Sequence, residues 1–129
     1  MKTIPSIAEF KSFRDKLSGT IGFVPTMGAL HDGHLSLINK SNHTCDYTIV
    51  SIFINPAQFS QKEDFNTYPQ TLNEDLELLK NFHVDAVFLP TNNIMYPSGY
   101  STFINENLLS MGLEGKSRPT FLKGVATVV

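Results

Sequence analysis

The sequence has one cysteine, little net charge and no long apolar run, and each shortage excludes a class of protein. Because Cys45 is the only cysteine in 129 residues, a disulfide framework is excluded and a reducing compartment is expected. The formal net charge is −2 and no lysine-rich face or tail is present, so charge gives no reason to expect a nucleic-acid partner. The opening residues MKTIPSIAEFKSF lack the apolar core of a signal peptide, and no run approaches a membrane span. We therefore expect a cytoplasmic protein.

What the chain does contain is a series of short, mostly apolar runs rich in β-branched residues. They are IGFV at 21–24, TIVSIFI at 48–54 and VDAVFLP at 84–90. None shows strict polar alternation, which is typical of parallel strands covered on both faces. Helix-like stretches separate these runs, so the sequence predicts one α/β domain over residues 1–129, with a doubly wound, Rossmann-like parallel sheet.

The helices are predicted from spacing and from capping signals. Ser6 with Glu9, and Thr71 with Glu74, have the spacing of a capping box, in which a side chain accepts from the third backbone N–H of a helix. The first of these opens a helix expected to end before Gly19, and the second opens LNEDLELLKNF. A third helix is expected over HLSLINKSNH, between the first two strands, and a fourth beginning near Phe121.

Three loops leave the carboxyl ends of the predicted strands. They read PTMGALHDGH, NPAQFSQKEDFNTYP and PTNNIMYPSGY, and each is rich in Pro, Gly or Asn. Ligands of an open parallel sheet bind at this edge, and a long strand-to-helix connection favours a functional role. We therefore expect Asn55, Gln58 and Tyr68 to converge on one crevice with His31 and His34.

The two histidines suit an anion. If a helix begins near Gly33, His31 lies in the turn and His34 in the first helical turn, beside backbone N–H groups that lack a partner within the helix. Those donors and the helix dipole favour a phosphate, to which histidine adds a donor or a proton. Gly28 and Gly33 allow close backbone approach or a positive φ. The pattern is typical of a site that binds a nucleoside triphosphate, where the α-phosphorus is attacked and pyrophosphate leaves.

Other interpretations of these residues stay open at this point. A metal site needs a third ligand, but His43, Cys45 and His83 lie on or next to other elements, so no metal site is predicted. The two histidines can also simply line a turn. For Asn55 the alternative is an Asn-Pro turn, and Gln58 can simply face water.

Five runs, in order, resemble the pantothenate synthetase (pantoate–β-alanine ligase) family: VPTMGALHDGH, SIFINPAQF, YPQTLNEDLELL, MYPSG and LEGKSRP. The H-x-G-H run alone indicates the wider HxGH superfamily of nucleotidyltransferases and class I aminoacyl-tRNA synthetases, and the N-P-x-Q-F run narrows the match. The resemblance covers nearly the whole chain. It implies that ATP, accompanied by Mg²⁺, activates pantoate to a pantoyl adenylate, and that β-alanine then displaces AMP to give pantothenate, the vitamin from which coenzyme A is made. It also implies a homodimer.

Position by position, the resemblance assigns two sets of site residues. ATP is placed along Met27, Gly28, Ala29, Leu30, His31, Asp32, Gly33 and His34. Within this run His31 and His34 face the phosphates as the catalytic pair, with His34 as the candidate proton donor. Pantoate and β-alanine are placed at Gln58, Asn55 and Tyr68, with Pro25 and Thr26 as the floor of the pocket.

Two departures from the family pattern limit what the resemblance implies. After Arg-Pro the family usually has x-His-Phe-x-Gly-Val, whereas here Phe121 takes the place of the histidine. The family also continues past position 129 with Gly-Glu-Lys-Asp and Ser-Ser-Arg-Asn segments that bind phosphates, so the match is to its N-terminal part, apparently truncated. We expect this chain alone to have little ligase activity. The alternatives are an inactive nucleotide-binding relic of that enzyme, or a nucleotidyltransferase for another small acid or phosphate.

Overall fold

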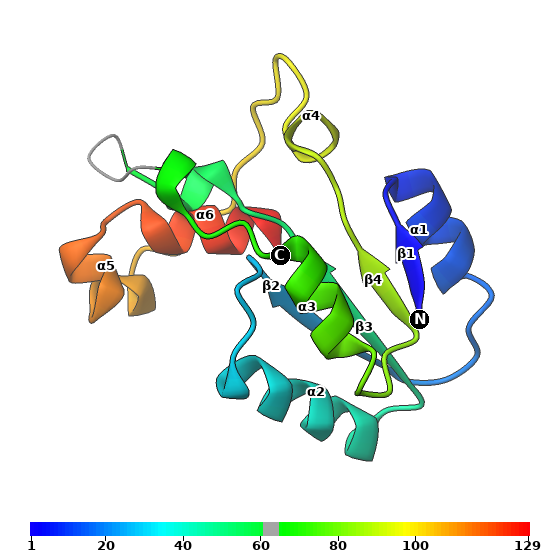
Figure 1. Ribbon diagram of the computed structural model, residues 1–129. Helices are drawn as coiled ribbons and strands as arrows, with labels where there is room; N and C mark the ends of the chain where they lie inside the picture. The colour runs from blue at the N-terminus through cyan, green and yellow to red at the C-terminus, as the bar shows by residue number, and fades with distance from the viewer. Residues whose placement is uncertain (61–64) are drawn as a thin grey trace.

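A computed structural model describes residues 1–60 and 65–129 of the chain. In this part of the chain one parallel four-stranded sheet forms in the order β1-β4-β3-β2, as Figure 1 shows. The strands are β1 (Lys2–Ile4), β2 (Ile21–Thr26), β3 (Tyr47–Ile52) and β4 (Ala86–Phe88). The predicted α/β class and the three predicted strands are confirmed. The sequence reasoning missed β1, because no apolar run marks it: two of its three residues, Lys2 and Thr3, are polar.

Helices connect the strands and follow the last of them. They are α1 (Ile7–Arg14), α2 (Asp32–Thr44), α3 (Leu72–Leu79), α4 (Asn92–Met95), α5 (Glu114–Ser117) and α6 (Phe121–Val128). Short 3-10 turns lie at Pro56–Gln58, Phe65–Thr67 and Leu109–Met111. The first of these, η1, directly follows β3 and carries one of the predicted site residues, Gln58.

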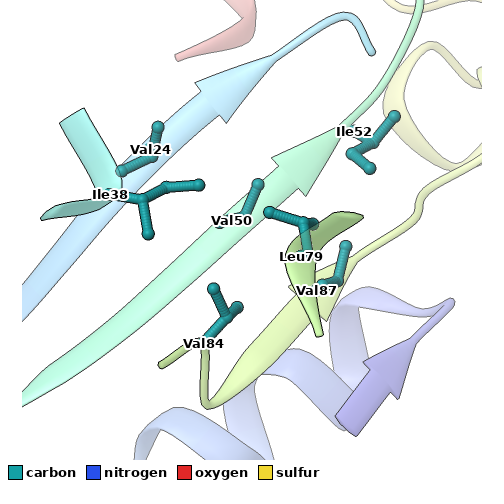
Figure 2. Packing of buried hydrophobic residues seen from close by; sticks show 7 residues of the cluster. All are labelled: Val24, Ile38, Val50, Ile52, Leu79, Val84 and Val87. Carbon is teal, nitrogen blue, oxygen red and sulfur yellow. The ribbon is translucent and has the colours of Figure 1, made fainter. Parts of the chain in front are cut away.

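The strand order places helices on both faces of the sheet. The chain crosses from β1 at one edge to β2 at the other, then steps back through β3 to β4. Right-handed crossovers that run in opposite directions leave their helices on opposite faces. Accordingly, Ile38 of α2 and Leu79 of α3 pack on one face, as Figure 2 shows, whereas Phe10 and Phe13 of α1 pack on the other.

Alternation along the strands decides which side chains meet each layer. The face covered by α2 and α3 buries Val24, Val50 and Val87, one from each of three neighbouring strands. On the opposite face, Ile49 and Phe88 pack toward α1. Helix α1 does not cover this second face near the carboxyl ends of the strands. Helix α6 and the candidate site lie there instead.

Element boundaries show where local signals were sufficient. The Ser6 hydroxyl accepts from the backbone N–H of Glu9 at 3.2 Å, which confirms the first predicted cap, although α1 ends at Arg14 and continues only as turns. The second predicted cap is wrong. Thr71 makes no side-chain cap bond, because its hydroxyl contacts Asp75 and the turn before α2 instead. Pro25 fits within β2 because β2 is an edge strand, where the missing N–H breaks no ladder bond.

No helix in the described part of the chain is both long enough and apolar enough to cross a membrane.

Candidate active site

A cleft of about 270 Å³ opens at the carboxyl end of the sheet, on the face that α6 covers. All three predicted loops contribute to it, although residues 61–64 of the second loop lie outside the described residues. Its lining residues are Phe23, Pro25, Thr26, Met27, His34, Ser51, Phe53, Gln58, Tyr68, Phe88, Pro90, Met95, Val125, Val128 and Val129. The walls are therefore mostly apolar, with a few polar groups among them, as in sites for small organic ligands.

Six of the predicted site residues line this cleft together: Pro25, Thr26, Met27, His34, Gln58 and Tyr68. The others do not line it. His31 lies next to the cleft at the start of α2, with its ring centroid 4.1 Å from that of His34. Residues 28–30 form the turn between β2 and α2, and Asn55 is buried behind Gln58.

The two histidines cap their own helix. His31 is the N-cap residue of α2, and its Nδ1 accepts from the backbone N–H of Gly33 at 3.1 Å. In return, Nδ1 of His34 accepts from the backbone N–H of His31 at 3.3 Å. This is a capping box with imidazoles in place of the usual hydroxyl and carboxylate. Because each Nδ1 accepts a backbone proton, each neutral ring carries its own proton on Nε2 and can donate from there.

This capping changes how the helix start can meet an anion. The sequence predicts that unpaired backbone N–H groups face a phosphate. Instead, the N–H groups of Gly28, Ala29, Leu30, His31 and Gly33 each donate to an acceptor within the protein. The side chains of Thr26, Asp75 and the two histidines take up these five donors, so the five cannot also serve a phosphate. The Nε2–H groups of the two imidazoles are the side-chain donors that this helix start can offer to an anion.

Two titratable groups of the cleft have shifted pKa values. Burial lowers the pKa of His34, and the nearby His31 lowers it further, while the Asp75 charge acts in the opposite direction. Burial, followed by the Asp75 charge, raises the pKa of the Tyr68 hydroxyl. Both shifts favour the uncharged form, so at neutral pH the cleft presents a neutral imidazole and a phenol, each able to donate a hydrogen bond.

Asn55 is predicted to line the substrate pocket, but its side chain is 1% exposed and bonded on both sides. Its Oδ1 accepts from the N–H of Ala57 at 3.2 Å and from the hydroxyl of Tyr96 at 2.6 Å. Its Nδ2 donates to the carbonyl of Gly124 at 3.0 Å and to Oε1 of Gln58 at 2.9 Å. Asn55 therefore does not face the cleft itself, and it holds the side chain of Gln58, which does.

The same bonds fix the orientation of the Gln58 amide. A backbone N–H can only donate and a backbone carbonyl can only accept, so Ala57 and Gly124 determine which atom of Asn55 is nitrogen. The nitrogen of Asn55 then donates to Gln58, whose oxygen is thereby occupied. Gln58 lines the cleft with its NH₂ group left to donate. A ligand group next to it is expected to be an acceptor, such as a carboxylate or hydroxyl oxygen.

Helix α6 approaches this support unusually closely. A Cβ on Gly124 would lie 2.3 Å from the carbonyl oxygen of Ala57 and 2.8 Å from the nitrogen of Gln58. Only glycine lets the helix reach η1 at this distance. Nearby, the guanidinium of Arg118 stacks 4.1 Å from the Phe121 ring and donates to the Gln58 carbonyl at 3.2 Å. Phe121 therefore packs behind the site and does not line the cleft.

Sequence reasoning missed the residues that support the site from a distance. Asp75 of α3 bonds the turn before α2, Tyr96 follows α4, and Gly124 lies in the middle of α6. Asp75 is 4% exposed although it is charged and lies in an amphipathic helix, where the pattern gives no sign of a buried carboxylate. A second cavity of about 480 Å³ borders Asp75 and Thr71 on the α3 side of the sheet, and shares Met27, Phe53 and Pro90 with the cleft.

The described residues do not gather three or more histidine, cysteine or acidic side chains at a point where they could hold a metal ion. The described side chains therefore do not form a site that holds a metal ion by themselves.

Comparison with known proteins agrees with this geometry. The family model described as pantoate-beta-alanine ligase matches residues 1–129. The chain belongs to the pantoate–β-alanine ligase family. It is 52% identical to a pantothenate synthetase of Pseudothermotoga lettingae over 131 aligned positions, which cover 100% of this chain and 47% of that protein.

Solved structures of the family superpose closely on the chain. A pantoate-beta-alanine ligase of Francisella tularensis, crystallised with beta-gamma ATP and beta-alanine, matches with a TM-score of 0.92 and 45% identity, over 99% of this chain and 50% of that one. The pantothenate synthetase of Thermus thermophilus matches with a TM-score of 0.89 and 41% identity, over 99% of this chain and 46% of that one. The chain thus spans about half the length of the relatives it matches.

Proposed function

We propose that this protein serves the condensation of pantoate with β-alanine, in which ATP first converts pantoate to a pantoyl adenylate. One arrangement supports the proposal most strongly. Two histidines at the start of α2 can donate from Nε2, and Gln58 lines the cleft beside them with its amide NH₂ free to donate. Membership of the family supports the same reaction.

The cleft suits pantoate in size and polarity. Pantoate is a small acid whose branched carbon carries two methyl groups, and the walls formed by Phe53, Phe88 and Val125 are apolar. Its carboxylate and hydroxyl oxygens are acceptors, which match the NH₂ of Gln58 and the hydroxyl of Tyr68. Because both donors are uncharged, the carboxylate keeps its negative charge and its nucleophilicity.

The first step joins a carboxylate oxygen of pantoate to the α-phosphorus of ATP, while the bond from that phosphorus to the bridging oxygen breaks and pyrophosphate leaves. Charge grows on the phosphate oxygens, and we assign Nε2–H of His34 and His31 to donate to them. In the second step the amine of β-alanine attacks the acyl carbon and AMP leaves. The lowered pKa of His34 favours a hydrogen-bond donor at neutral pH over a donor of a whole proton.

Three further features belong to the same proposal. Met27 and the turn at 28–30 would border the nucleotide, with Asp32 and Gly33 at the start of α2 beside its phosphates. Mg²⁺ would enter bound to ATP, since the described residues form no cage for it. A homodimer and a cytoplasmic location stay predictions.

Calorimetric titration of this chain with pantoate and, separately, with ATP and Mg²⁺ tests the proposal. A hydrogen bond to a charged group contributes about 1.5–3 kcal/mol, so Gln58→Ala should weaken pantoate binding by about tenfold or more and leave ATP affinity nearly unchanged. His34→Ala should do the opposite. Asn81→Ala, which removes an exposed amide that lines neither cavity, is the matched control.

The outcomes separate the alternatives. Equal weakening of both ligands by Gln58→Ala would mean that this residue only supports the fold. ATP binding without pantoate binding would favour a nucleotide-binding relic or a transferase for another acid. Binding of neither ligand by the unaltered chain would contradict the proposal for this chain.

A further inference from the structure

The turn that carries the protein from β2 into the histidine helix has a strained backbone. Gly28 has φ +83° and Ala29 has φ +51°, so two consecutive residues lie in the left-handed region. For Ala29, which has a Cβ, this conformation costs about 1 kcal/mol. A strained turn needs contacts from outside to stabilise it. Its conformation matters for the site, because His31 and its cap follow within two residues.

Asp75 is the group that holds it. One carboxylate oxygen accepts from the N–H of Ala29 at 2.9 Å and the other from the N–H of Leu30 at 2.8 Å. The hydroxyl of Thr71, one turn earlier on α3, donates to the same carboxylate at 3.0 Å and also accepts from Ala29 at 3.2 Å. These contacts span more than forty residues of sequence, so they tie α3 to the entry of α2.

The surroundings of Asp75 suit this contact. Its side chain is 4% exposed, and each oxygen already accepts from a donor within the protein. A Cβ at position 28 would lie 3.0 Å from Oδ2, so the glycine makes room for the carboxylate. Bonds from backbone N–H groups to a carboxylate are among the stronger hydrogen bonds in proteins, and here burial shields them from water.

We propose that Asp75 is the positioning residue of the phosphate site, fixing the strained turn so that His31 and His34 cap α2 through Nδ1 and offer Nε2–H to a phosphate. The inference rests on the proposed function for its ligand, but its structural half stands on the contacts alone. The charge of Asp75 also opposes the other influences on the His34 pKa, which couples the two groups electrostatically.

Nuclear magnetic resonance of this chain tests the structural half without any ligand. In Asp75→Asn the amide exchange of Ala29 and Leu30 should speed up by at least about tenfold, because an amide NH₂ then faces backbone N–H donors. The imidazole nitrogen shifts should move from the Nε2–H tautomer toward a mixture. Glu74→Gln, an exposed change on the same helix, should alter neither signal.

A second variant keeps the test decisive if Asp75→Asn does not fold. Thr71→Val removes only the hydroxyl between Asp75 and Ala29, and should speed exchange at Ala29 more than at Leu30. The inference is overturned by wild-type exchange and tautomers in a folded Asp75→Asn or, where that variant does not fold, by unchanged Ala29 exchange in Thr71→Val.

Titration with ATP and Mg²⁺ then tests the functional half. Asp75→Asn should weaken ATP binding by about tenfold, because it removes hydrogen bonds to a charged group that hold the site in place. Glu74→Gln should leave ATP binding unchanged. If the unaltered chain binds no ATP, the proposed function fails, and the exchange and tautomer data still decide the role of Asp75.

Discussion

Replacing Gly124 with alanine is the most direct test of how α6 completes the site. The new Cβ would lie 2.3 Å from the Ala57 carbonyl oxygen and 2.6 Å from its carbon, both of them backbone atoms that cannot rotate away. Helix α6 would have to withdraw by about 1 Å to reach ordinary contact. That movement would lengthen the 3.0 Å bond between Asn55 and the Gly124 carbonyl.

The cost follows from two effects that act in the same direction. Overpacking of a tight contact costs about 1–3 kcal/mol, and a buried amide that loses its partner costs about 1–3 kcal/mol. The better helix propensity of alanine returns about 1 kcal/mol. The free energy of unfolding should therefore fall by about 1–5 kcal/mol, unless detachment of α6 costs less and occurs instead. In both cases Asn55 loses one of the bonds that hold it against Gln58, so pantoate affinity falls.

Urea unfolding followed by circular dichroism measures the stability, and amide exchange in α6 shows whether the helix has detached. Gly112→Ala is the matched control, since its φ of −89° is ordinary and no atom lies within 4 Å of the added carbon. The control should stay within about 0.5 kcal/mol of the unaltered chain. A Gly124→Ala variant with unchanged stability and fully protected α6 amides would refute the reasoning.

Two further predictions concern the groups around the cleft. Tyr96→Phe removes the hydroxyl that donates to Asn55 at 2.6 Å and keeps the ring contacts with Phe53 and Tyr100, so it should lower the free energy of unfolding by about 1 kcal/mol. Tyr100→Phe is its control, and equal loss from both variants would show that the hydroxyl bond is unimportant. The second concerns pH. The pKa of His34 is lowered in the folded state, so its contribution to stability is complete above the unfolded value of about 6.5 and is lost as the pH falls through the folded value. Protonation would also turn the Nδ1 acceptor of the cap into a donor facing the His31 N–H. The melting temperature should therefore drop on acidification from about pH 7.5 to about pH 5.5 by more in the unaltered chain than in His34→Asn, and an equal drop would remove His34 as the cause.

The two predicted helix caps show where a local sequence pattern is sufficient and where a tertiary contact overrides it. Ser6 formed its cap because donor and acceptor lie within one turn of chain, where sequence spacing alone fixes their distance. Thr71 has the same spacing to its glutamate, yet its hydroxyl turned to Asp75 and Ala29. The competing partner Ala29 lies more than forty positions away along the chain, and no local pattern contains it.

By itself, the sequence determined the parallel α/β class, strands β2, β3 and β4, and the convergence of Gln58, Tyr68 and His34 at the carboxyl edge. Those follow from hydrophobic period and from the rule that loops of parallel strands share an edge, both of which are properties of short segments. Only the tertiary structure decided what each polar group does there. It buried Asn55 as a support, used up the backbone N–H groups before α2, and assigned Asp75 and Gly124 to hold the site. Hydrogen bonds are directional and exclusive, so a donor's role depends on which acceptor lies within about 3 Å of it, and packing of distant segments sets that distance.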